Sequence, residues 1–150
     1  MKIEKATIQD SKLLTELTIR SKSYWDYGQK QIEAWKSELS VPETYIVEKN
    51  VYKLTNNNTI IGYYSFYELN QSDVKLENLF VDPESIGKGI GKRLMVDCIK
   101  RVKNLSYTKI ILDADPNAEN FYKKLGFTVI GKLETSIKNR YLPIMELLIN

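Results

Sequence analysis

Residues 76–94 read LENLFVDPESIGKGIGKRL, and this stretch is the most informative part of the chain. A run of β-branched and aromatic residues ends at Pro83, and three glycines, at positions 87, 89 and 91, follow as a helical pattern begins. Glycine permits positive φ and a close approach of a ligand, and the first amides of a helix lack partners within it. The stretch therefore predicts a strand, an anion-binding loop and a helix in succession.

The spacing of these glycines excludes two familiar phosphate loops. A Walker A loop needs Ser or Thr after its Lys, whereas Lys92 is followed by Arg93. A dinucleotide fingerprint that starts at Gly87 needs its third glycine where Lys92 stands. The alternative that stays open is structural, since the glycines also suit a tight connection between a strand and a helix.

The hydrophobic patterns on both sides of this stretch predict one mixed α/β domain over residues 1–150. Helices are expected from Asp10 as N-cap through Tyr24, around Ile32 to Leu39, over 88–104, and from Asp115 as N-cap to Gly126 at C′. Pro143 indicates a bulge or a sheet edge in the last strand. Seven strands are expected, at 2–8, 45–54, 59–67, 74–81, 109–114, 127–137 and 141–149.

The amino-acid composition limits which catalytic groups, ligands and partners the chain can use. The chain has 150 residues, 22 basic and 19 acidic side chains, a net charge of +3, no His and one Cys. The mild, well-mixed charge argues against a nucleic-acid or membrane partner, and the missing His argues against a metal site and removes the commonest general base. With no internal disulfide, signal peptide or apolar span in the sequence, we expect a cytoplasmic protein.

A second stretch, residues 113–127, reads DADPNAENFYKKLGF. It resembles the Asn-x-x-Ala-x-x-Phe-Tyr-x-x-x-Gly-Phe signature of the GNAT superfamily of N-acetyltransferases, with Ala118 closer to Asn117 than in the commonest form. The loop that starts at Ile86 is similar to the acetyl-CoA loop of the same family, Arg/Gln-x-x-Gly-x-Gly/Ala, although Ile86 replaces the usual Arg or Gln. The resemblance implies a GNAT-like fold, a central twisted mixed sheet of about seven, mostly antiparallel strands with about four helices.

The resemblance also implies the residues that hold acetyl-CoA as a co-substrate. The loop would grip the pyrophosphate mainly through backbone amides, Asn117 would contact the pantetheine arm, and a strand would offer backbone groups to the pantetheine amides. These cofactor-binding residues are Leu79, Phe80, Val81, Ile86, Gly87, Lys88, Gly89, Ile90, Gly91, Lys92 and Asn117.

Two side chains are predicted to be catalytic. An alkylammonium has a pKa of about 10, so an amine acceptor must lose a proton before or during its attack, and Glu77 is the candidate base, acting through water. The family motif places Tyr122 near the thioester sulfur, where a phenol can donate a proton to the departing thiolate. Cys98 lies on the apolar face of a predicted helix and is expected to be structural. Glu77 as a solvated strand residue and Tyr122 as core packing remain the alternatives.

The acceptor is predicted to be a primary amine of a small molecule or peptide that attacks directly in a ternary complex. In this family the N-terminal helices line the acceptor pocket, and here their connection contains Tyr24, Trp25, Asp26 and Tyr27, which suit a cationic or aromatic amine. The aromatic residues are equally compatible with a helix-face core.

Two other functions stay open at this point. One is a catalytically weak, CoA-binding regulatory module, which the departure at Ile86 favours. The other is a ribosome- or RNA-directed acetyltransferase, which the weak net charge disfavours. The chain is expected to act as a monomer or homodimer.

Overall fold

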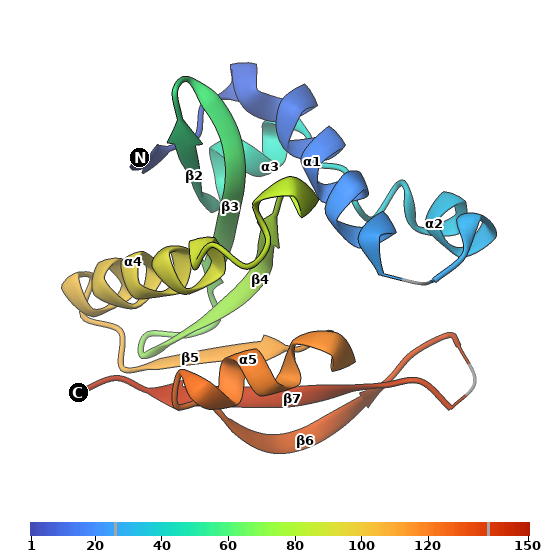
Figure 1. Ribbon diagram of the computed structural model, residues 1–150. Coiled ribbons are helices and arrows are strands. Elements are labelled where there is room, and N and C mark those ends of the chain that lie inside the picture. The colour runs from blue at the N-terminus through green and yellow to red at the C-terminus, as the bar shows by residue number, and fades with distance from the viewer. Residues whose placement is uncertain (26, 138) are drawn as a thin grey trace. The chain divides into compact units, whose positions relative to one another are not determined.

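The computed structural model describes residues 1–25, 27–137 and 139–150 (Figure 1). The chain divides into two compact units, which we describe separately. The first unit comprises Met1–Phe66 and Asn78–Cys98, and the second comprises Tyr67–Glu77 and Ile99–Asn150. The expectation of one domain over residues 1–150 stays a prediction.

The first unit packs helices against antiparallel strands. Its strands β1, β2 and β3 pair antiparallel in sequence order. A buried cluster of Ala6, Leu14, Leu17, Val41, Ile46, Val51 and Tyr63 joins the helices to these strands. The elements are β1 (Lys2–Lys5), the 3-10 turn η1 (Ile8–Asp10), α1 (Ser11–Tyr24), α2 (Gln29–Trp35), α3 (Glu43–Glu48), β2 (Asn50–Asn56), β3 (Thr59–Glu68), the end of β4 (Asp73–Val81), the 3-10 turn η2 (Pro83–Ser85) and the start of α4 (Ile90–Asn104).

The predicted strand 45–54 is wrong in its first part, because Glu43–Glu48 forms the helix α3. Pro42 takes the N-cap position with a β-region backbone, and Glu43 places a carboxylate in the first turn, where the helix dipole favours it. Ile46 is buried while Val47 is 72% exposed. Helical geometry therefore lets this short apolar segment bury one side, although its residue types favour a strand.

Asp10 stands at the N-cap position of α1, but its side chain makes no capping hydrogen bond there. Its carboxylate instead accepts the backbone N–H of Thr7 at 2.8 Å and the Nζ of Lys53 at 2.8 Å. The predicted cap thus belongs to η1, the turn that precedes the helix, and it also ties that turn to β2.

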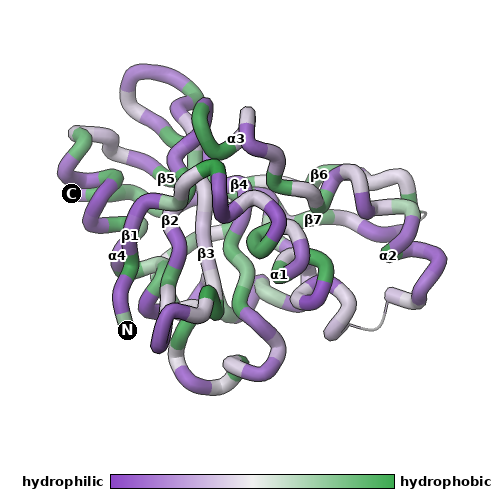
Figure 2. The backbone as a smooth tube through the Cα atoms, turned by 90° about the horizontal axis from the view of Figure 1, so that it is seen from above, coloured by the Kyte–Doolittle hydropathy of each residue, from purple (hydrophilic) through white to green (hydrophobic). Residues whose placement is uncertain are grey.

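The strand β3 is buried although its residues are only moderately hydrophobic, as its pale colour in Figure 2 shows. Its tyrosines are accommodated by hydrogen bonds from both faces of the strand. The Tyr63 hydroxyl bonds to Thr18 of α1, and the Tyr64 hydroxyl donates to Asp97 of α4 at 2.7 Å. These hydrogen bonds provide partners for the two tyrosine hydroxyl groups, and a buried hydroxyl without a partner would destabilise the fold.

Gly62 lets α4 approach β3 closely. A Cβ added there would lie 3.0 Å from Leu94 Cδ1 and 3.1 Å from the Phe80 carbonyl oxygen, which belongs to the backbone and cannot turn aside. We therefore expect Gly62→Ala to lower stability by about 1–3 kcal/mol and Tm by about 3–10 °C, measured by thermal denaturation. Gly131→Ala is the control, because its Cβ would meet Ile144 at an ordinary 3.5 Å; an equal loss in both variants would contradict this account.

The second unit packs α5 (Glu119–Lys124) with the end of the sheet. It contains the start of β4, the end of α4, β5 (Lys109–Asp113), the 3-10 turn η3 (Pro116–Ala118), α5, β6 (Thr128–Glu134) and β7 (Tyr141–Leu148). β5 runs parallel to β4, and β7 pairs antiparallel with both β5 and β6. As predicted, Asp115 caps the helical segment, accepting the N–H of Asn117 at 2.9 Å, and Gly126 ends it with φ of +102°.

Pro143 does not mark an edge, because β7 lies between β5 and β6. The missing N–H is tolerated because the β5 ladder ends one residue earlier, with the pair Asp113 and Ile144. The irregularity lies on the partner strand, where the register of β6 shifts between Val129 and Gly131. β6 is thus the edge strand at this end of the sheet.

The order of hydrogen-bonded strands is β1-β2-β3-β4-β5-β7-β6. β4 and β5 form a parallel pair, and the other recorded pairs are antiparallel. Five α-helices accompany the seven strands in the described parts of the chain. The predicted fold class, a mixed and mostly antiparallel sheet with helices, is confirmed. No helix within the described residues is long and apolar enough to cross a membrane.

Candidate active site

In the first unit, the connection from β4 to α4 is a glycine-containing loop. Gly87 and Gly89 have φ of +85° and +76°, which only glycine adopts readily. A Cβ added at either position would meet no atom within 4 Å, so the space beside both α-carbons is open. Gly91, by contrast, is part of α4. Two of the three glycines therefore allow the loop a backbone conformation that other residues rarely adopt.

The loop leads directly into the first turn of α4. The N–H of Arg93 donates to the Gly89 carbonyl at 3.1 Å. Residues 90–92 precede that bond and occupy the first turn, where α-helical geometry provides no carbonyl partner for the amides. Backbone amides at such a position, together with the helix dipole, favour an anion.

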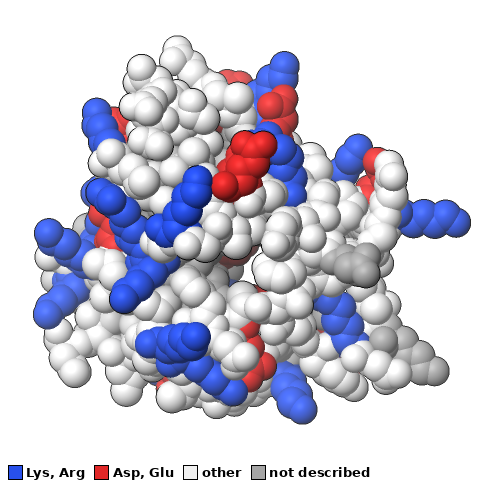
Figure 3. Space-filling view, viewed as in Figure 1, with Lys and Arg blue, Asp and Glu red and all other residues white. Residues whose placement is uncertain are grey.

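Basic side chains surround this helix start. Lys88, Lys92 and Arg93 are exposed, and Figure 3 shows Lys and Arg side chains gathered on the face where Figure 1 places α4. Cations at a helix N-terminus oppose the helix dipole. An anion bound at the loop would offset that repulsion, so the residues present fit a pyrophosphate group.

Ile86 is 42% exposed and extended, with φ of −65° and ψ of 143°. Its side chain brings no charge or hydrogen-bonding group to the loop. An anion bound at this point would therefore have to be held by the backbone amides and the neighbouring lysines.

The backbone of Leu79–Val81 lies beyond the pairing of β4 with β5. That pairing runs from Asp73 opposite Lys109 to Lys75 opposite Ile111. The edge of β4 after Lys75 is consequently not used by this ladder, and its N–H and C=O groups suit an extended ligand that pairs like a strand. Phe80 packs its ring against the core of the first unit, 5.9 Å from the ring of Tyr63.

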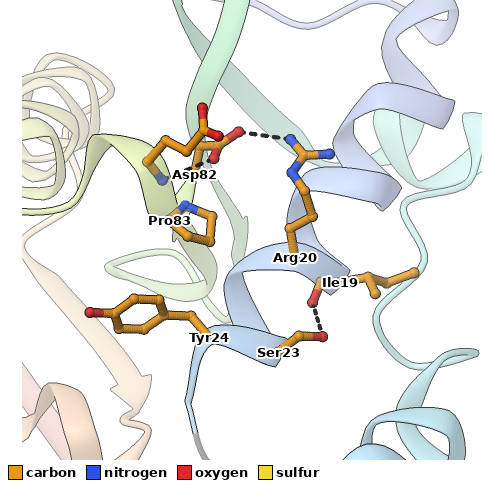
Figure 4. A pocket seen from close by; sticks show the side chains of 7 residues that line it. Ile19, Arg20, Ser23, Tyr24, Asp82 and Pro83 are labelled. Carbon is orange, nitrogen blue, oxygen red and sulfur yellow. Dashed lines mark hydrogen bonds and ion pairs between the residues drawn. The ribbon is translucent and has the colours of Figure 1, made fainter.

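A groove lies between the end of α1 and η2 (Figure 4). Its volume is about 640 Å³, within the range of small-molecule sites. Arg20 of α1 and Asp82 beside η2 form an ion pair between the two sides of the groove, and the half-exposed ring of Tyr24 lies below Pro83 in this view. The lining residues are Ile19, Arg20, Ser23, Tyr24, Asp82, Pro83 and Glu84.

The aromatic side chains at and after the end of α1 form two separate pairs of rings. Tyr24 and Trp25 meet edge to face with centroids 5.2 Å apart, and both rings are partly exposed. Tyr27 instead meets Trp35 at 5.0 Å, and the ammonium of Lys22 lies 5.1 Å from both of these rings. Tyr27 therefore already binds a cation from its own chain. Asp26, the carboxylate predicted to accompany these rings, lies outside the described residues.

The remaining predicted residues belong to the second unit. Tyr122 is 7% exposed and packs edge to face against Phe121 and Phe127, with centroids 5.2 and 5.5 Å away. Asn117 is exposed in η3, and Glu77 is exposed on β4. The structure thus groups the loop, Leu79–Val81 and the aromatic connection in one unit, and Glu77, Asn117 and Tyr122 in the other.

Residues 23–146 match the acetyltransferase (GNAT) domain. The chain belongs to the GNAT acetyltransferase family. The family prediction is confirmed, and it rests on most of the chain rather than on the two motifs alone.

Individual GNAT relatives agree with this assignment. The peptidyl-lysine N-acetyltransferase YjaB of Salmonella typhimurium is 33% identical over 73 residues, 49% of each chain. The chain spans about half the length of the curated relatives it matches. The crystal structure of a PaiA N-acetyltransferase from Thermoplasma acidophilum in complex with coenzyme A has a TM-score of 0.81 at 24% identity, over 97% of this chain and 96% of that one.

A second solved structure, YncA from Salmonella typhimurium with acetyl-CoA, has a TM-score of 0.72 at 20% identity, over 100% of this chain and 94% of that one. Both structural likenesses establish the GNAT fold.

Among the described residues of this GNAT chain, Asp73 and Tyr107 have shifted pKa values. A hydrogen bond from Asn70 lowers the pKa of Asp73 in the turn before β4. A hydrogen bond to the Glu68 carboxylate, 2.7 Å long, raises the pKa of Tyr107. Within the described residues, no group of three His, Cys, Asp or Glu side chains is arranged to hold a metal.

The sequence analysis missed Arg20. Nothing in the local pattern distinguishes it from the other exposed basic residues of α1, and its partner Asp82 lies far along the chain. The sequence does indicate that Asp82, directly before Pro83, caps the turn, but it does not indicate which cation pairs with this carboxylate.

Proposed function

We propose that this chain is an N-acetyltransferase that transfers the acetyl group of acetyl-CoA to a primary amine of a small molecule or peptide. The observation that carries the proposal is the loop geometry, with Gly87 and Gly89 at positive φ directly before α4. In a chain of the GNAT family, that arrangement supports our proposal that the loop binds the pyrophosphate of coenzyme A.

The related proteins support both substrates. The PaiA and YncA structures contain coenzyme A and acetyl-CoA, respectively, and YjaB acts on peptidyl lysine. All of these fit an acyl donor with a pyrophosphate and an acceptor with a primary amine.

The proposed roles within the chain follow from charge and hydrogen bonding. Residues 86–92 bind the pyrophosphate, and the edge of β4 at Leu79–Val81, beyond its pairing with β5, offers backbone groups to the pantetheine amides. Asn117 contacts the pantetheine arm from η3. Glu77, exposed on β4, takes the proton from the attacking amine through water. Tyr122 donates a proton to the departing thiolate.

Direct transfer needs no covalent intermediate on the enzyme, because a thioester is already activated. The thiol of Cys98 is buried on α4, which fits a structural role. The acceptor amine is proposed to enter beside Tyr24 and Trp25, whose rings are partly exposed. Tyr27 contributes to the same region by holding Lys22 and Trp35 in place.

A catalytically weak, CoA-binding regulatory module is the second candidate. The exposed apolar side chain of Ile86, where the family pattern has Arg or Gln, favours it. In such a module the loop would bind coenzyme A while transfer to amines would be slow.

A turnover assay separates the two candidates. With acetyl-CoA and a panel of diamines, aminoglycosides and lysine peptides, we expect release of free CoA thiol to depend on at least one amine, with kcat in the usual range of about 1 s⁻¹ or more. Mass spectrometry of the product identifies the acetylated nitrogen. Tight binding of acetyl-CoA without turnover of any amine would instead favour the regulatory module.

A further inference from the structure

An ion pair in the first unit links α1 to the turn that leads into the glycine loop. Arg20 Nη2 lies 2.8 Å from Asp82 Oδ2, and Figure 4 shows the two side chains pointing toward each other across the groove. α1 is itself anchored, since Leu14 and Leu17 are fully buried and Thr18 bonds to Tyr63. Arg20 therefore extends from a fixed helix.

Asp82 is the residue that sets the start of this turn. Its Oδ1 accepts the N–H of Glu84 at 3.2 Å, while its Oδ2 accepts the arginine. Its backbone N–H donates to the Ile61 carbonyl at 2.8 Å, and its carbonyl accepts the N–H of Ser85 at 2.8 Å. The carboxylate therefore shares its two oxygens between the cap of η2 and the side chain of Arg20.

The exposure of the pair argues against a mainly stabilising role. The Arg20 side chain is 50% exposed and that of Asp82 is 17% exposed. An ion pair in such a position is screened by water and salt and contributes little to global stability. Its effect on local geometry is greater, because the bond to Arg20 selects one rotamer of the Asp82 carboxylate, which caps η2. The turn η2 then runs directly into the segment Ile86–Gly89.

We propose that Arg20 is a positioning residue for the coenzyme A loop. By holding the carboxylate of Asp82, it fixes η2 and thereby the backbone at Gly87 and Gly89 in the conformation that binds the pyrophosphate. The inference rests on the proposed function in one respect only, the assignment of coenzyme A to this loop.

Three variants test the inference. Arg20→Met removes the charge but keeps an apolar stem, and Asp82→Asn keeps an oxygen that can cap η2 while losing the charge that attracts Arg20. We expect each variant to raise the Kd of coenzyme A, measured by calorimetry, and the KM of acetyl-CoA by about fivefold. Because both act through one contact, the double variant is expected to be no worse than either single variant.

Controls separate positioning from general damage to the helix. Lys12→Met removes an exposed charge from the same helix and is expected to change none of these values. Arg20→Lys, which keeps a positive charge near Asp82, is expected to restore the Kd to within about twofold of wild type. The KM of the amine, kcat and Tm are expected to stay close to wild type in Arg20→Met.

A ligand-free measurement distinguishes failure of this inference from failure of the proposed function. The backbone amide resonances of Gly87 and Gly89 are expected to shift in Arg20→Met and Asp82→Asn but not in Lys12→Met. Unchanged resonances with an unchanged Kd would overturn the role of Arg20, as would additive losses in the double variant or a rise confined to the KM of the amine. If wild-type protein binds no coenzyme A, the proposed function fails, and the resonances alone decide whether Arg20 orders the loop.

Discussion

Gly89→Val is expected to weaken the binding of coenzyme A by about 100-fold or more, because it removes the backbone geometry that presents amides to the pyrophosphate. Gly89 has φ of +76°, which a β-branched residue adopts only under strain. Relaxation of that strain would turn the amides of the loop away from the ligand, and hydrogen bonds to a charged group contribute about 1.5–3 kcal/mol each. Calorimetric titration with coenzyme A measures the loss.

Gly28→Val is the matched control for Gly89→Val. Gly28 has φ of +80°, and an added Cβ meets no atom within 4 Å at either glycine, so the backbone strain is alike. We expect both variants to lose similar thermal stability, while only Gly89→Val loses affinity for coenzyme A. Retained affinity in Gly89→Val, with the fold intact by circular dichroism, would show that the pyrophosphate binds elsewhere.

Tyr122→Phe is expected to lower kcat by about 100-fold or more while the KM of acetyl-CoA stays nearly constant. General acid catalysis typically contributes a factor of about 10² to 10⁴, and the substitution removes the hydroxyl alone. The ring of Tyr122 is 7% exposed between Phe121 and Phe127, so phenylalanine preserves these edge-to-face contacts. Steady-state kinetics with the best amine of the panel measures the change.

Tyr107→Phe provides the comparison for Tyr122→Phe. Tyr107 lies in the same unit and donates a hydrogen bond to Glu68 at 2.7 Å, so its substitution also removes a phenol. We expect it to leave kcat within about twofold of wild type. Equal kcat values for wild type and Tyr122→Phe would assign Tyr122 to the core and leave protonation of the thiolate to water.

Local sequence signals predicted much of the fold because their physics is local. The cap at Asp115 and the proline at N1 start the helical segment, the left-handed Gly126 ends it, and each acts on the backbone of its nearest neighbours. The apolar spacing of residues 88–104 likewise predicted α4, which begins two residues later than expected because the loop glycines are not helical. Elements with such signals needed no knowledge of the rest of the chain.

The predictions that failed depended on partners distant in sequence. The segment Glu43–Glu48 has strand-forming residues, yet it is helical because one side packs into the core beside Tyr63. Pro143 suggested a bulge or an edge in β7, but β7 lies between β5 and β6, and the irregularity in their pairing falls on β6. Asp10 does stand at the N-cap position of α1, as predicted, but its carboxylate bonds to Thr7 and to Lys53 of β2 and makes no capping hydrogen bond to that helix.

The amino-acid sequence was enough to predict the glycine loop and the second motif, and these two motifs together predicted the family. Such motifs can be recognised locally because the backbone geometry of a short segment depends mainly on its own residues. The tertiary structure alone decided that Gly62 admits α4, that Lys22 occupies the rings of Tyr27 and Trp35, and that Arg20 reaches Asp82. Each of these contacts joins residues from different elements or turns, so its existence depends on how the chain packs, which no local pattern specifies.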